Sequence, residues 1–392
     1  MSQAIISRRG GGYATITFNG VSALKRTGAA ALSEARSYLA ATTVGNYALF
    51  GGGANASGFQ SKVYAYDTSL TKSIPSALSE ERRNLAATTV GNYALFGGGE
   101  KSGSNYLSTV DAYNTSLTRS TPTALSVGRN TLVATTVGNY ALFGGGVGYS
   151  TERLPTVDAY NTSLTRTTPT VLSEGKYDLA ATTVGNYALF GGGWSESSGY
   201  TSTVDAYNTS LTRTTPTALS VARSELAATT VGNYALFGGG RISASVYSTV
   251  DAYNTSLNRT TQTALSATMN ELAATTVGNY ALFGGGYNLS TVNAYNTSLT
   301  RTIATPLSEA RKGLAATTVG DYALFVGGYN DSNNVHTATV DAYYVNNKVL
   351  VYPGTKYKLG SMSSESTSST MQEIETTAPI TGYIKIKDAT IN

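Results

Sequence analysis

The stretch LAATTVGNYALFGGG, residues 39–53, returns in near-identical form along most of this chain. Aligned on the valine, its seven copies fall at Val44, Val90, Val137, Val184, Val231, Val277 and Val319. The intervals between them are 46, 47, 47, 47, 46 and 42 residues. A nearly fixed period of this length is typical of one repeat architecture and not of separate domains.

One copy, residues 129–175, shows what each repeat encodes. Short runs of β-branched, aromatic and apolar residues predict four strands, at residues 132–137, 140–143, 156–160 and 164–168. Gly138-Asn139 favours a two-residue hairpin, because both positions tolerate positive φ. Asn161-Thr-Ser163 is typical of an Asx turn, and about ten irregular residues join the second strand to the third. We therefore expect each repeat to form a four-stranded antiparallel sheet.

Such a sheet cannot bury both of its faces alone, so the repeats must pack against one another around an axis. The first strand suits the innermost position because residues 40–43 are small. Tyr47, Leu49 and Phe50 are large enough to fill the space between neighbouring sheets. The sequence predicts an all-β fold, a seven-bladed β-propeller over residues 23–345.

The seventh repeat contains only three of the four strands, within residues 314–344. Residues 23–31 match the fourth strand of the other repeats, with the same spacing to the basic residue that follows. We expect this N-terminal segment to complete the last sheet, which would close the ring and cover its edges. A strand at residues 348–352 is the competing candidate.

The composition excludes several classes of function. Only 13% of the residues are charged and the net charge is +4, a balance that gives no support to nucleic-acid binding. The chain has no cysteine, which excludes disulfides and thiolate metal sites. No apolar run approaches the ~18 residues of a membrane helix, and the first residues lack the apolar core of a secretion signal. We expect no membrane insertion, and a cytoplasmic location unless the protein belongs to a particle.

Three positions recur within the repeats. A basic residue usually precedes the first strand, at Arg36, Arg82, Arg129, Lys176, Arg223, Met269 and Arg311. Glycines follow the second strand, and a tyrosine lies in the third, at Tyr66, Tyr113, Tyr160, Tyr207, Tyr253 and Tyr295. This pattern resembles kelch repeats over residues 24–345, although the family's later Trp is replaced by Ser or Thr. The resemblance implies a propeller fold and leaves the function open.

The sameness of the copies and the flanks SRRGGGYATITFNG and TGYIKIKDAT are similar to kelch-like structural proteins of phages and prophages of Gram-positive bacteria. That resemblance implies a virion component of the tail, baseplate or head surface. Residues 1–22 and 346–392 would then be β-rich attachment segments that contact other virion proteins in an oligomeric assembly. Alternation of apolar and polar residues predicts strands at 13–18 and 381–391.

Catalysis has little support in this sequence. The only histidine, His336, lies in a polar loop, and we interpret it as solvated. We expect no enzymatic activity, no cofactor and no metal. The Asn-Thr-Ser sequences match the glycosylation pattern, but their regular place in a tight turn favours a structural explanation.

Two charged sets also recur. The third strands carry Asp111, Asp158, Asp205, Asp251 and Asp341, and the fourth strands carry Arg26, Lys72, Arg119, Arg166, Arg213, Arg259 and Arg301. We interpret each Asp and Arg as a cross-strand ion pair. A ring of metal sites is the alternative, and it would need more than one carboxylate per repeat.

The connections between the second and third strands differ from repeat to repeat, as do the segments before the first strand, whereas the remaining turns barely change. In an antiparallel sheet these two variable parts share one side. The variable connections hold the residues that we predict to bind a ligand, namely Phe59, Tyr106, Tyr149, Arg153, Trp194, Tyr200, Arg241, Tyr247, Tyr287 and Tyr329. Aromatic residues with Ser, Gly and Asn on a rigid frame are typical of binding surfaces. Drift of weakly constrained loops would produce the same variation.

The sequence thus predicts a non-enzymatic virion surface protein whose variable rim binds a glycan or a protein of the host surface. One alternative is a structural or decoration protein of a virion with no ligand. A second alternative is a cellular kelch scaffold that binds a protein partner.

Overall fold

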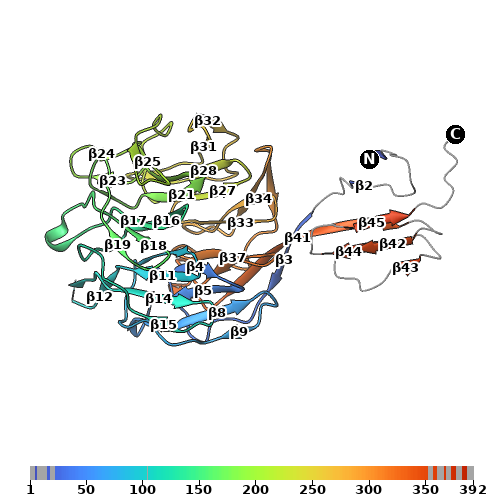
Figure 1. Cartoon of the computed structure of the whole chain (residues 1–392), viewed down its shortest axis with the longest axis horizontal. Coiled ribbons are helices and arrows are strands. Elements are labelled where there is room, and N and C mark those ends of the chain that lie inside the picture. Colours follow the sequence, from blue (N-terminus) through green and yellow to red (C-terminus); the bar gives the residue numbers. More distant parts are fainter. Residues whose placement is uncertain are drawn as a thin grey trace. The chain divides into compact units, whose positions relative to one another are not determined.

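The computed structural model describes residues 5–6, 16–17, 23–103, 105–351, 356–359, 366–367, 372–376 and 382–385. These residues form an all-β structure, and their one helical element is the 3-10 turn η1 (Tyr149–Thr151) (Figure 1). Contacts divide the chain into a repeat body, residues 27–342, and a second unit formed by residues 1–26 and 343–392. Among the described residues, no helix has the length and apolarity needed to cross a membrane.

Six sheets of the repeat body are four-stranded and antiparallel, each with its strands in sequence order, and the sheet of the seventh repeat differs as described below. The first strands are β4 (Ala40–Val44), β10 (Ala86–Val90), β16 (Val133–Val137), β21 (Ala180–Val184), β27 (Ala227–Val231), β33 (Ala273–Val277) and β37 (Ala315–Val319). The second strands are β5 (Tyr47–Gly51), β11 (Tyr93–Gly97), β17 (Tyr140–Gly144), β22 (Tyr187–Gly191), β28 (Tyr234–Gly238), β34 (Tyr280–Gly284) and β38 (Tyr322–Val326).

The outer half of each sheet is less uniform. The third strands are β8 (Val63–Asp67), β14 (Val110–Asn114), β18 (Val157–Asn161), β25 (Val204–Asn208), β31 (Val250–Asn254), β35 (Val292–Asn296) and β41 (Val340–Val351). The fourth strands are β9 (Lys72–Ser73), β15 (Arg119–Ser120), β19 (Arg166–Thr167), β26 (Arg213–Thr214), β32 (Arg259–Gln262) and β36 (Arg301–Ala304). The prediction of four short antiparallel strands per repeat is confirmed.

The sheet of the seventh repeat has the strand order β3-β41-β38-β37, in which β3 (Ala23–Gly28) comes from the N-terminal side of the repeats. Beyond β3, the Ala29 N–H donates to the Val340 carbonyl at 3.3 Å and the Leu32 N–H to the Ala338 carbonyl at 2.9 Å. Residues 348–351, the competing candidate for this position, instead continue the third strand β41. The outer place in this sheet therefore belongs to β3.

In the second unit, β1 (Ile5–Ile6) pairs with β2 (Ile16–Thr17), and β44 (Gln372–Thr376) pairs with β41. A small sheet contains β43 (Ser366–Thr367), β42 (Lys356–Leu359) and β45 (Gly382–Lys385). The strands predicted at 13–18 and 381–391 coincide with β2 and β45 in part, and the rest of both predictions lies outside the described residues.

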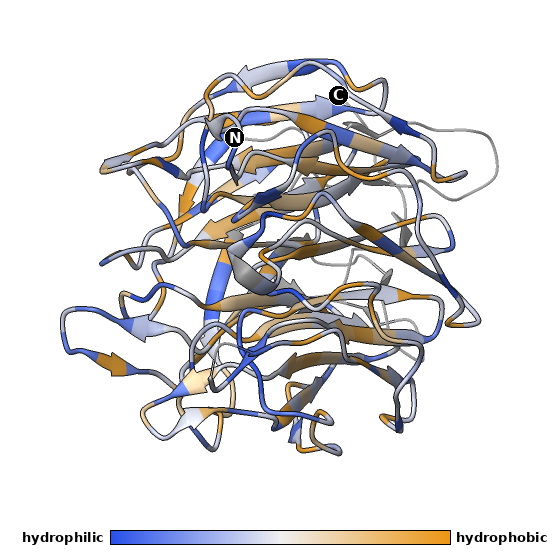
Figure 2. Cartoon of the chain, turned by 90° about the vertical axis from the view of Figure 1, so that its left-hand side faces the viewer, coloured by the Kyte–Doolittle hydropathy of each residue, from blue (hydrophilic) through white to orange (hydrophobic). Residues whose placement is uncertain are grey.

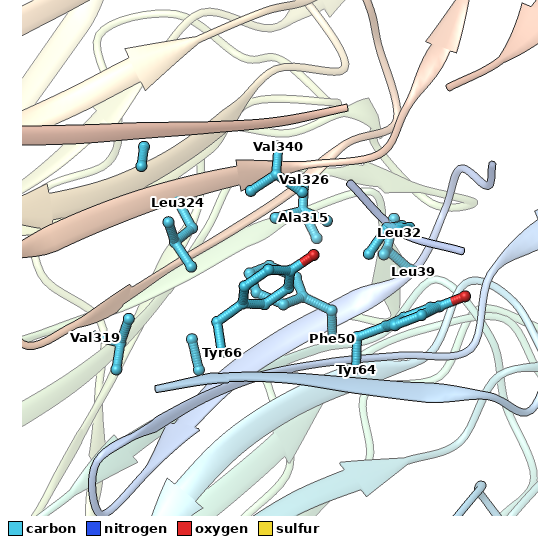
Figure 3. Close-up of a cluster of buried hydrophobic side chains, with 12 residues drawn as sticks. Leu32, Leu39, Phe50, Tyr64, Tyr66, Ala315, Val319, Leu324, Val326 and Val340 are labelled. Carbon is cyan, nitrogen blue, oxygen red and sulfur yellow. The ribbon is translucent and has the colours of Figure 1, made fainter. Parts of the chain in front are cut away.

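The core lies between neighbouring sheets and not within one of them. Most hydrophobic clusters combine residues of two successive repeats, as where Leu142 and Val157 of the third repeat pack with Phe190 and Tyr207 of the fourth. Figure 3 shows the cluster that joins Phe50 and its neighbours in the first repeat to residues 315–340 of the seventh. Figure 2 shows hydrophobic and hydrophilic segments following one another along the ribbon, as expected when strands face a core and turns face solvent.

The glycine that ends the second strand in six of the repeats allows this close packing. A Cβ atom built on Gly144 would lie 2.7 Å from Cε1 of Phe190 in the next sheet. The same contact would arise at Gly51, Gly97, Gly191, Gly238 and Gly284. The glycine runs thus bring neighbouring sheets together, as their sequence context suggests.

A Gly144→Ala variant should therefore lose about 1–3 kcal/mol of unfolding free energy, the usual cost of overpacking a filled core. Gly28→Ala is the matched control, because a Cβ at Gly28 would meet no atom within 4 Å. Chemical denaturation of both variants measures the difference. Equal stabilities would contradict the packing role of Gly144.

Threonines join the first strands to one another. Thr42 Oγ1 lies 2.8 Å from Thr89 Oγ1, and equivalent pairs are Thr88–Thr136, Thr135–Thr183, Thr182–Thr230, Thr229–Thr276 and Thr275–Thr318. Thr43 and Thr317, of the first and seventh repeats, are 3.0 Å apart in the same way. Small side chains that also hydrogen-bond across the junction explain why the sequence Ala-Ala-Thr-Thr is kept in almost every repeat.

Candidate binding face and its central mouth

The variable connections and the segments before the first strands lie together, as predicted. In five repeats a backbone bridge joins the two, between Ser37 and Ala54, Arg83 and Glu100, Asn130 and Val147, Ser224 and Arg241, and Lys312 and Tyr329. In the fourth repeat β20 (Lys176–Tyr177) pairs with β23 (Trp194–Ser195). We call the surface formed by these connections and segments the variable face.

The connections are more regular than the sequence suggests, because most of them fold into two-stranded ribbons. These ribbons are β6 (Ala54–Asn55) with β7 (Gly58–Phe59), β12 (Glu100–Lys101) with β13 (Asn105–Tyr106), β23 with β24 (Gly199–Tyr200), β29 (Arg241–Ile242) with β30 (Ser245–Val246), and β39 (Tyr329–Asn330) with β40 (Val335–His336). The connection of the third repeat, the one for which the sequence predicts irregular residues, holds instead the 3-10 turn η1 and single backbone bridges from Val147 to Asn130 and Arg153, so that prediction is confirmed.

The uniform turns have a packing explanation. Gly45 is the first residue of the two-residue hairpin between β4 and β5 and has φ +53°, whereas Asn46 does not take positive φ. The predicted two-residue hairpin is confirmed, and only its glycine takes positive φ. A Cβ on Gly45 would lie 3.1 Å from Cγ2 of Thr115, in the Asx turn of the next repeat. In that turn Asn114 Oδ1 accepts hydrogen bonds from the N–H groups of Ser116 and Thr118.

The recurring aspartates form ion pairs, and four of them pair with a second basic residue besides the predicted cross-strand partner. Asp158 Oδ1 accepts from Arg166 Nη1 at 2.8 Å across the hairpin. Its Oδ2 accepts from Nη2 of Arg129, the basic residue before the first strand, also at 2.8 Å. Ser126 donates its N–H and hydroxyl to the same carboxylate. The Asp158 and Arg129 side chains are both 0% exposed, and burial lowers the pKa of Arg129 while Asp158 opposes that shift.

The same arrangement recurs at Arg82–Asp111–Arg119, Lys176–Asp205–Arg213 and Arg223–Asp251–Arg259. The sixth repeat replaces both buried charges at once, since Met269 and Asn293 occupy these places, with Asn293 Nδ2 3.6 Å from Met269 Sδ. Neither charge remains to be neutralised there. These carboxylates are thus structural, and among the described residues no group of acidic or histidine side chains could hold a metal ion.

Two predicted binding residues come together between the third and fourth repeats. The guanidinium carbon of Arg153 lies 4.8 Å from the ring centroid of Trp194 and 5.6 Å from that of Tyr177. The Trp194 and Tyr177 rings are 5.8 Å apart at 57°. Tyr200 is the strand partner of Trp194 across the ribbon, and Tyr149 on η1 is 79% exposed. We call Arg153, Tyr177, Trp194 and Tyr200 the aromatic cluster.

The other predicted residues are spread around the variable face, each against its own neighbours. Arg83 lies over the Phe59 ring at 4.7 Å, and Lys312 lies over the exposed Tyr287 ring at 4.8 Å. Arg241 pairs with Glu225 at 2.5 Å. The remaining predicted residues sit on the connections, with Tyr106 and Tyr247 half-buried and Tyr329 stacked edge-on against His336.

His336 is not a solvated loop residue, contrary to the prediction. It belongs to the ribbon strand β40 and is half-buried. Its Nδ1 lies 3.1 Å from the Ser37 hydroxyl, and its ring packs on Tyr329 at 5.1 Å between centroids. Burial lowers the pKa of His336 below its usual value. This residue therefore helps to join the seventh repeat to the first.

Sequence reasoning missed the centre of the variable face. The residue before the conserved leucine of each repeat lies there, and these mouth residues are Tyr38, Asn84, Thr131, Asp178, Glu225, Glu271 and Gly313. All have positive φ, between 48° and 58°. The unusual backbone directs the N–H of one repeat to the carbonyl of the preceding one, as from Asn84 to Tyr38 at 3.1 Å and from Tyr38 to Gly313 at 2.7 Å. The only available signal was variation at this one position beside an invariant leucine.

The mouth residues surround a cavity of about 520 Å³, whose lining also includes Leu179, Leu226, Leu272 and Leu314. Its charge is uneven, because the carboxylates of Asp178, Glu225 and Glu271 come from three successive repeats. Glu271 Oε2 accepts from the Tyr38 hydroxyl at 3.1 Å. Burial, with smaller contributions from Glu225 and Glu271, raises the pKa of Asp178 to about 7 against the opposing effect of Arg241.

No protein-family model matches this chain, and no curated protein matches its sequence.

Proposed function

We propose that the repeats form a closed, seven-bladed β-propeller of the kelch type. Three observations support closure. β37 of the seventh repeat contacts β4 of the first, Thr317 hydrogen-bonds to Thr43, and the cluster in Figure 3 combines both repeats. The recurring glycines and tyrosines support the kelch type because they pack between neighbouring sheets, and the recurring basic residue supports it because it pairs with the buried aspartate of its own repeat.

We propose that the chain is a non-enzymatic binding module that recognises a carbohydrate of a bacterial surface through its variable face. The observation that carries this proposal is the ordering of the variable connections on one side. Ribbons and bridges hold half-buried aromatic rings around a common centre. Because this surface is already ordered, binding of a ligand would cost little conformational entropy of the connections. The aromatic cluster is the best candidate for contact with a sugar ring, because Arg153 already fixes the Trp194 ring.

The test is binding of the full chain to bacterial cells and to glycans released from them. Trp194→Ala and Tyr200→Ala should each weaken binding at least about tenfold, equivalent to about 1.4 kcal/mol. Tyr187→Ala is the matched control, because Tyr187 begins β22 beside the uniform hairpin turn of the same repeat. Binding that is unchanged by both substitutions would refute the role of the aromatic cluster.

The virion assignment rests on the resemblance of the repeats and flanks to phage proteins. We propose that the terminal segments, residues 1–22 and 346–392, mount the repeat body on other virion proteins. Antibody labelling of intact particles would locate the protein on a tail, baseplate or head surface. Labelled particles without any cell or glycan binding would favour a decoration protein that has no ligand.

A further inference from the structure

The cavity at the mouth has one carboxylate that the protein leaves without a counter-charge. Glu225 is paired with Arg241 and accepts from the Asn270 amide at 2.8 Å. Glu271 has Lys312 within 3.5 Å as well as the Tyr38 hydroxyl. Among the described residues, no ion pair or hydrogen bond reaches the Asp178 carboxylate, which lines the same cavity.

The other charged groups near the mouth do not neutralise Asp178. Arg241 and Lys312 are engaged with Glu225 and Glu271, and Lys312 also contacts Asp331 at 3.1 Å. Arg83 lines the cavity, but its Nε donates to Glu100 at 2.8 Å. Solvent screens the charge of a half-buried carboxylate less than that of an exposed carboxylate. A cation that binds beside Asp178, with two further negative charges nearby, therefore gains more electrostatic free energy than it would at an exposed carboxylate.

The size and lining of the cavity favour an organic cation over a metal ion. No group of side chains among the described residues could hold a metal ion. A volume of about 520 Å³ lies in the range of small-molecule sites. Part of its wall is apolar, formed by the conserved leucines of the repeats. This combination suits a ligand with both a charged group and a carbon skeleton.

We propose that the mouth binds an organic cation, a protonated primary amine, whose charge pairs with the Asp178 carboxylate while its carbon chain contacts the leucines. The site is separate from the aromatic cluster and does not depend on carbohydrate binding there. The amine could belong to an amino-substituted surface polymer or to a lysine side chain, because both present the same group.

Calorimetry of the full chain with Nα-acetyl-lysine methylamide tests this proposal. The probe stays charged across the range used, since a lysine amine has a pKa near ~10.4. Affinity should rise about thirtyfold from pH 5.5 to pH 8.5, as a carboxyl group with a pKa of about 7 loses its proton. The Nε-acetylated probe, which has the same skeleton without the charge, should not bind.

Asp178→Asn should weaken binding at least about tenfold and remove its pH dependence. Glu152→Gln is the matched control, because Glu152 is an exposed carboxylate on the variable face outside the cavity. Thermal unfolding checks that both variants are folded. No binding of the charged probe, equal binding of the acetylated probe, or pH-dependent binding that persists in folded Asp178→Asn would each overturn the proposal. Loss of glycan binding in Trp194→Ala bears only on the aromatic cluster.

Discussion

An Asp158→Ala variant will lose about 3–5 kcal/mol of unfolding free energy, the expected cost of removing one partner from a buried ion pair. The loss is large because Arg129 has no exposed surface and would keep its charge without a carboxylate. Arg166 and the Ser126 hydroxyl lose the same acceptor. Chemical denaturation of the full chain measures the change.

The sixth repeat supplies the matched control for this prediction. The double variant Arg129→Met with Asp158→Asn copies its Met269 and Asn293 into the third repeat. We expect the double variant to lose less than half of what Asp158→Ala loses, because no buried charge is left unpaired. If the double variant is as unstable as the single one, the cost lies in packing and not in the unpaired guanidinium.

A chain that begins at residue 29, and so lacks β3, will be less stable by roughly 2–5 kcal/mol and will self-associate. Removal of β3 takes away the hydrogen bonds of one strand, each worth roughly 0.5–1.5 kcal/mol net. It also leaves an edge of β41 unpaired in the sheet of the seventh repeat. Free strand edges pair readily with other chains. Thermal unfolding and sedimentation measure the two effects.

A chain that begins at residue 23 is the control, because it keeps β3 and loses only residues 1–22. It should unfold at the same temperature as the full repeat body and should not self-associate through this edge. If the two truncated chains unfold at the same temperature and sediment alike, then β3 does not stabilise the last sheet. The proposal of a closed ring would then lose its main energetic support.

Local chemistry made much of the repeat predictable. The hairpin at Gly138-Asn139 and the Asx turn at Asn161 depend on a few neighbouring residues, so their pattern predicts them directly. The ion pair of Asp158 with Arg166 also follows from strand register, because the two residues face each other across one hairpin. The even spacing of the copies indicated that such sheets pack on one another.

The structure decided what depends on contacts between repeats. Arg129 reaches Asp158 only after the chain has folded back through two strands, and the ribbons form only where a connection meets the segment before its own first strand. The mouth combines Asp178, Glu225 and Glu271, one residue from each of three repeats. Sequence by itself determined the strands, the turns and the side on which variation gathers, because these follow from short-range pattern. Only the packing of one sheet on the next determined which variable residues share a cavity, because that packing brings distant positions within contact distance.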